Sequence, residues 1–139
     1  ALYNRVIQQH GGCLVYDIHS YNYIRKGDDA PAFNLGTEQL DVAKYGEVIN
    51  HWMGLLGEIT IPNHTIRAGL DEVFYGRGYQ ATIAKDFKNT LVLPTEFKKF
   101  FMNEMTGEVD QAVIDDMKPK FEQAILDNVE KFSEIFLSK

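Results

Sequence analysis

Two short apolar runs constrain the fold of this chain more than any other feature of its sequence. One occupies residues 13–18 and is interrupted only by Asp17; the other occupies residues 91–93 and precedes Pro94. Continuous apolar runs of this length are typical of strands covered on both faces, as in a parallel sheet. We expect Pro94 to end the second strand, because a proline has no amide hydrogen to give to a strand ladder.

Helical patterns surround these two strands. Residues 1–10 carry apolar side chains at helical spacing, and residues 39–57 place another apolar set along one side. In residues 108–137 apolar side chains recur every three or four positions, which predicts one long amphipathic helix with a kink or a new first turn at Pro119. Strands that alternate with helices favour an α/β fold, with a mostly parallel or mixed sheet flanked by helices.

Two segments carry weaker signals. Residues 20–37 are rich in glycine, aspartate, proline and asparagine and predict a long loop. Residues 58–88 are irregular, with a short strand candidate at residues 58–61.

Length, charge and cysteine content limit the possible partners. The chain has 139 residues, enough for a single domain, and its net charge of -6 argues against a nucleic-acid partner. No apolar run approaches the roughly 20 residues needed to cross a bilayer, so we expect a soluble protein without a membrane partner. The single cysteine, Cys13, cannot form an internal disulfide, which fits a cytoplasmic location.

The first helical segment starts at Ala1 without a capping residue before it. We therefore expect residues 1–139 to be the C-terminal part of a longer catalytic domain. An incomplete domain would expose a sheet edge, through which homo-oligomers could form.

Polar residues follow both strands, where ligands collect in sheets of this kind. His19 ends the first strand, with Asp17 two residues earlier on the same face, and a carboxylate so placed can fix the tautomer of a metal-binding histidine. Glu96 follows the second strand and could act as a general base if burial or a metal tunes its pKa. Taken singly, such a histidine is more often a hydrogen-bonded residue at a core edge, and such a glutamate is more often solvated.

Four motifs occur in order between about residue 11 and residue 108: "YDIHSY", "FNLGT", "FYGRGY" and "TEFKKFFMNEMTGE". Together they resemble the N-formylglutamate amidohydrolases, a family of the zinc carboxypeptidase-like superfamily. Arg77 stands where the glycine-rich turn of that family has a second glycine, so another substrate is possible.

The resemblance implies a zinc carboxypeptidase-like hydrolase fold and a zinc cofactor. It implies that His19 is a zinc ligand, that Glu96 is the base acting on the metal-bound water, and that Asp17 and Ser20 lie around the ligand. The implied substrate is a small N-acyl amino acid. An acidic substrate also requires cationic groups, for which Arg77 and Arg67 are the candidates, each weighed against an ordinary surface arginine.

The sequence departs from the family in its metal ligands. The family takes two further zinc ligands from an early His-x-x-Glu-type motif that this sequence lacks. The other histidines, His10, His51 and His64, are interpreted as capping, surface or packing residues. Three interpretations stay open: an N-formylglutamate-type amidohydrolase, a related zinc hydrolase acting on another N-acyl amino acid or peptide, and a metal-free module without activity.

Overall fold

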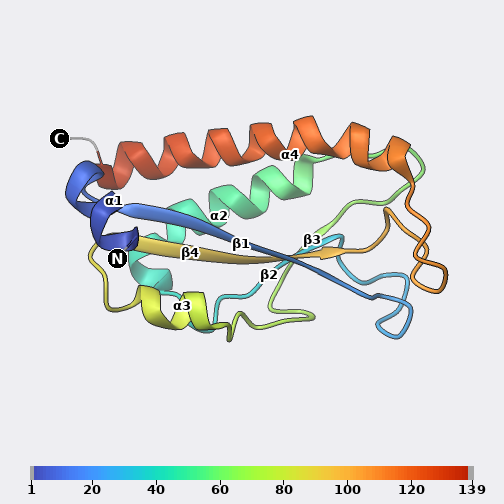
Figure 1. The fold of residues 1–139 in the computed structure, drawn as a ribbon, viewed down its shortest axis with the longest axis horizontal. Helices are drawn as coiled ribbons and strands as arrows, with labels where there is room; N and C mark the ends of the chain where they lie inside the picture. The colour runs from blue at the N-terminus through green and yellow to red at the C-terminus, as the bar shows by residue number, and fades with distance from the viewer. Residues whose placement is uncertain (1, 138–139) are drawn as a thin grey trace.

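A computed structural model describes residues 2–137 of the chain. Figure 1 shows its helices and strands packed in layers around one sheet. In chain order the elements are α1 (Leu2–His10), β1 (Cys13–Tyr21), β2 (Phe33–Leu35), α2 (Val42–Glu58), β3 (Ala68–Leu70), α3 (Tyr79–Ala84), β4 (Thr90–Lys98), α4 (Gln111–Phe132) and η1 (Ser133–Leu137), the last a turn of π-helix.

The sheet has four strands in the order β1-β4-β2-β3. β1 pairs with β4 in parallel, and β2 pairs with β3 in parallel, whereas β4 and β2 are antiparallel. The expected α/β fold with a mixed sheet flanked by helices is therefore confirmed. None of the helices described over residues 2–137 is long and apolar enough to cross a membrane.

One face of the sheet carries the main hydrophobic core. Helices α2 and α4 lie along this face, and α3 lies on the opposite side (Figure 1). Trp52 of α2 is completely buried there and donates a hydrogen bond from Nε1 to Thr95 Oγ1 at 3.0 Å. Phe33 and Leu93 are also completely buried, and each such side chain contributes about 1.5–3 kcal/mol through removal of apolar surface from water.

The opposite face changes character along its length. Near the start of β4, Val92 packs with Val15 and with two alanines of α3 in a small second core. Further along the same strands, the side chains on this face are Asp17, His19 and Glu96. The polar end of this face holds the candidate site.

Several elements differ from the sequence prediction. β4 does not end at Pro94 but continues to Lys98. Pro94 lies opposite Gly36, just beyond the end of β2, so its missing amide hydrogen removes no bond from within the β2–β4 ladder. The predicted loop at residues 20–37 contains β2, whose ladder with β4 is formed with residues distant in the sequence.

The predictions for residues 58–88 and for the last helix also need correction. α2 extends to Glu58, so the strand candidate at residues 58–61 is wrong, and the segment forms β3 and α3 instead. α4 runs through Pro119 as one element, so no new helix begins there, although the proline cannot donate to the carbonyl one turn earlier. The other predicted helices are present with shifted ends.

Candidate functional site

Three polar side chains form a row across the sheet. His19 of β1 is paired with Glu96 of β4, and Glu96 is paired with Asn34 of β2. Directly paired residues in neighbouring strands present their side chains on the same face of the sheet. The structure therefore brings His19 and Glu96 together, with Asn34 beside them.

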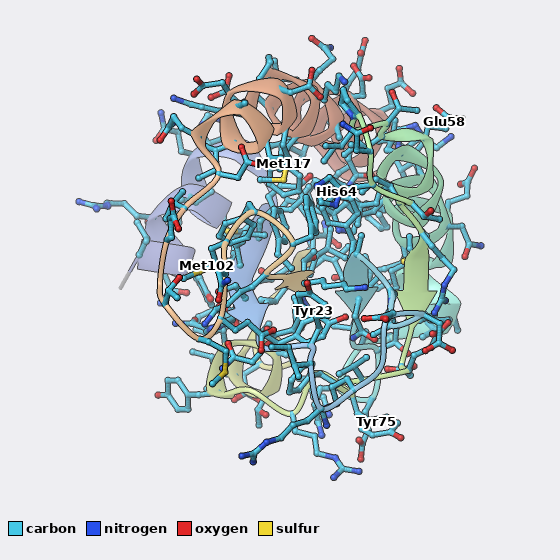
Figure 2. The ribbon with its side chains drawn as sticks, turned by 90° about the vertical axis from the view of Figure 1, so that its right-hand side faces the viewer. Tyr23, Glu58, His64, Tyr75, Met102 and Met117 are labelled. Carbon is cyan, nitrogen blue, oxygen red and sulfur yellow. The ribbon has the colours of Figure 1, made fainter. Side chains whose placement is uncertain are left out.

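A pocket of about 410 Å³ lies over this row. Its floor is formed by β1 and β4, and its wall by the segment that follows β3. Figure 2 shows Tyr75, in that segment, on the side of the molecule opposite α4. The volume suits a small ligand. The lining residues are Asp17, His19, Gly36, Val73, Phe74, Tyr75, Gly76, Arg77, Gly78, Pro94 and Glu96.

His19 is held by Asp17. The His19 Nε2 atom lies 2.9 Å from Asp17 Oδ1, and the His19 side chain is 59% exposed, against 21% for that of Asp17. A carboxylate at this distance fixes the orientation of the ring and favours a proton on Nε2, which leaves Nδ1 as the nitrogen for a ligand.

Glu96 is the half-buried carboxylate of the pocket. Burial raises its pKa above the usual value for a glutamate; the nearby His19 lowers the pKa, and the negative charge of Asp17 raises it further. A carboxylate with a raised pKa holds a proton more readily near neutral pH, which suits a group that must accept a proton and return it.

Arg77 lies at the rim of the pocket and is largely exposed. Its Nε donates a hydrogen bond to Glu38 Oε2 at 2.5 Å, and its guanidinium carbon lies 5.2 Å from the centre of the Tyr75 ring. These two contacts give the guanidinium group a defined orientation beside the pocket.

The other predicted site residues lie elsewhere. Arg67 is outside the pocket lining: its Nη1 donates to Glu72 Oε1 and its Nη2 donates to the Asp29 carbonyl, each at 2.7 Å. Ser20 follows His19 in β1, so strand alternation places its side chain on the opposite face.

The remaining histidines also lie outside the pocket. His51 Nδ1 is 3.1 Å from Asn128 Oδ1, on the face covered by α4, and His64 packs against the ring of Phe100. His10 lies in the last turn of α1.

The pocket does not by itself fit a complete catalytic zinc centre. Within residues 2–137, no three histidine, cysteine, aspartate or glutamate side chains form a group that could hold a metal ion. A catalytic zinc normally takes three protein ligands. His19 can supply one, while the nearest carboxylate, Asp17, is already bonded to the ring of His19.

The sequence prediction did not include Asn34 or Gly36 among the site residues, and it named residues 74–76 only as part of the "FYGRGY" motif. Asn34 and Gly36 lie in the "FNLGT" motif, within the stretch whose composition predicts a loop. The apolar-polar-apolar order of Phe33, Asn34 and Leu35 is a strand signal. It covers only three residues, which makes it easy to overlook.

Comparison of the chain with protein-family models, with curated proteins and with solved structures found no match. Inference about function therefore rests on the chemistry of the pocket and on the motifs of the sequence.

Proposed function

We propose that the pocket belongs to an amidohydrolase that removes the formyl group from N-formylglutamate or a similar N-acyl amino acid. The observation that carries the proposal is the direct pairing of His19 with Glu96, since both side chains then face the same pocket. The order of the sequence motifs supports the substrate class. Another N-acyl amino acid or a peptide is the alternative substrate, favoured by Arg77 in place of a glycine.

In this proposal Glu96 is the general base. It accepts a proton from a water molecule whose oxygen bonds to the amide carbonyl carbon. The carbon–nitrogen bond then breaks, and Glu96 returns the proton to the leaving nitrogen, which yields formate and the free amino acid. The raised pKa of Glu96 favours the first proton transfer, because a more basic carboxylate is a stronger acceptor for the proton of the water molecule.

Arg77 is the proposed contact for a substrate carboxylate. Its Nε bond to Glu38 fixes the plane of the guanidinium group at the pocket rim. The two Nη groups of an arginine held this way suit a carboxylate, which they can bind through two parallel hydrogen bonds. Arg67, paired with Glu72 outside the pocket lining, does not share this task.

His19 is the proposed contact between this chain and a catalytic zinc ion. Among residues 2–137 no group of three side chains could hold the metal, so a catalytic zinc ion bound to His19 would require further ligands. Metal analysis after dialysis against zinc tests the assignment: any zinc held by the protein should fall in His19→Ala. Zinc retained at an unchanged level in that variant would remove His19 from the proposal.

Glu96→Gln tests the proposed reaction in the natural full-length protein. Release of formate from N-formyl-L-glutamate should slow by about 10²–10⁴-fold, because the amide side chain cannot accept the proton. Glu130→Gln, on the exposed surface of α4, is the matched control and should keep its activity. Normal turnover in Glu96→Gln would show that Glu96 is not the base.

A panel of N-acyl amino acids tests the substrate class. Acidic substrates should have lower KM values than neutral ones of the same size, and Arg77→Gln should remove that difference. Equal KM values in the unaltered protein would favour the alternative substrates.

A further inference from the structure

Asn34 is a completely buried polar residue beside the pocket. Its Oδ1 accepts hydrogen bonds from the amides of Glu72 at 3.1 Å and Val73 at 2.9 Å, and its Nδ2 donates to the Phe74 carbonyl at 2.8 Å. One side chain thus binds the backbone of three consecutive residues. Those residues lead directly into the pocket wall.

A second set of contacts fixes the same segment from the residues that follow β2. Asp71 accepts hydrogen bonds from the amide of Thr37 at 2.7 Å and from its hydroxyl at 2.5 Å. The Glu38 amide donates to the Tyr75 carbonyl at 3.0 Å. Between these bonds the backbones of Gly36 and Gly76 are in direct contact, so close that a Cβ on Gly36 would lie 2.1 Å from the Gly76 nitrogen.

We infer that Asn34 is a positioning residue: it holds residues 72–74 on the sheet, and through them it places Arg77 at the rim of the pocket that His19 and Glu96 line. The inference rests on the proposed function for the role of Arg77. That Asn34 holds this segment follows from the hydrogen bonds alone.

The chemistry of the asparagine side chain explains why this residue type is needed. The position must accept two amide hydrogens and donate one hydrogen to a carbonyl, and only a side-chain amide offers both functions at this length. Leucine has a similar shape and offers neither function. Aspartate retains the acceptor, but it turns a second oxygen toward the Phe74 carbonyl and adds a charge beside Glu96.

Asn128 provides a matched control. It is also completely buried, and it also bonds through both ends of its amide, to Tyr16 Oη at 3.0 Å and to His51 Nδ1 at 3.1 Å. It belongs to α4 on the opposite face of the sheet. A generic cost of losing a buried amide should therefore appear in both variants, whereas a displaced pocket wall should appear only on changing Asn34.

The experiment compares Asn34→Leu, Asn34→Asp and Asn128→Leu in the natural full-length protein. Amide hydrogen exchange is read at Glu72 and Val73, relative to the most protected amides of β4. In Asn34→Leu these two amides should lose their protection, and kcat/KM for N-formyl-L-glutamate should fall by about tenfold to a hundredfold, mainly through KM. Asn34→Asp should keep part of the protection, since its carboxylate can still accept both amides.

Asn128→Leu should leave both the exchange at Glu72 and Val73 and the KM unchanged. Equal exchange at these amides in the two leucine variants would overturn the inference, as would a loss in kcat alone with KM unchanged. If the unaltered protein hydrolyses no N-acyl amino acid, the proposed function fails, and the exchange data still decide whether Asn34 holds the segment. If Asn34→Leu does not fold, the comparison of Asn34→Asp with Asn128→Asp is used with the same criteria.

Discussion

Alternate residues of the same strands form the two faces of the sheet, and the two faces differ in burial and in the chemistry of their side chains. On β4, Leu93 and Thr95 face α2 and α4 and are completely buried, whereas Pro94 and Glu96 face the pocket. The first face is a packed core in which Thr95 is bonded to Trp52. The second is covered by α3 at one end and by the segment after β3 at the other. The first face thus supplies most of the buried core, and the second combines a small core at one end with the pocket of the proposed chemistry at the other.

Trp52→Ala should show the largest effect and tests the first face. Removal of this completely buried ring leaves a cavity between α2 and the sheet and takes the donor from Thr95, so unfolding should become easier by about 3–5 kcal/mol. Urea unfolding followed by circular dichroism measures the change. A decrease of less than about 1 kcal/mol in the free energy of unfolding would show that the Trp52 ring contributes little to the core on this face.

Gly36→Ala should have the next largest effect and tests the second face. An added methyl group would overlap the backbone of Gly76, so the segment must move away from β2, at an expected cost of about 1–3 kcal/mol. Gly54→Ala is the control, because a Cβ there meets nothing within 4 Å and should stabilise α2 by about 0.5–1 kcal/mol. Equal stability in the two variants would show that the close contact does not constrain the segment.

The two faces also differ in how far the sequence predicts them. The apolar run at residues 91–93 predicted a strand buried on both faces, and these residues are buried. The same reasoning overstated burial at the end of β1, where Ile18 is 41% exposed because β1 is an edge strand within the described residues. Strand ends were enough to suggest His19 and Glu96 as neighbours. The sequence did not indicate that both residues lie inside their strands, because each strand continues past its expected end.

The attachment of the pocket wall to β2 could not be predicted in the same way. β2 has three residues and is stabilised by its ladders with β4 and β3, which are long-range contacts invisible to a local pattern. The role of Asn34 depends on the packing of residues 72–74 beside it. Nothing near Asn34 in the sequence indicates that this distant segment lies there. The shift of Pro94 from a strand end to a strand interior likewise depends on where β2 stops.

Ionisation of Glu96 should make the stability of the pocket face depend on pH, with an effect smaller than that of either substitution above. Burial raises the pKa of Glu96 in the folded protein, so its ionisation opposes folding. Below the ordinary glutamate pKa of about 4.3 this cost is absent, and it grows as the pH rises through the raised folded pKa. Glu96→Gln should therefore be more stable than the unaltered protein at pH 7, and the difference should vanish near pH 4. Thermal unfolding at both pH values measures it; a destabilised variant at pH 7 would contradict the assigned cause.

The smallest effect is expected from the two arginines, which compare the rim of the pocket with the surface beyond it. Arg67 lowers the pKa of Glu72 through their hydrogen bond, so the pair contributes to stability above the ordinary glutamate pKa, and the contribution is lost as the pH falls through the lowered one. Both side chains are more than two-fifths exposed, so Arg67→Gln should cost at most about 1 kcal/mol and leave KM unchanged. Arg77→Gln should raise KM for N-formyl-L-glutamate without a measurable change in unfolding. A rise in KM for Arg67→Gln alone would exchange the roles of the two residues and move the substrate contact away from the pocket over Glu96.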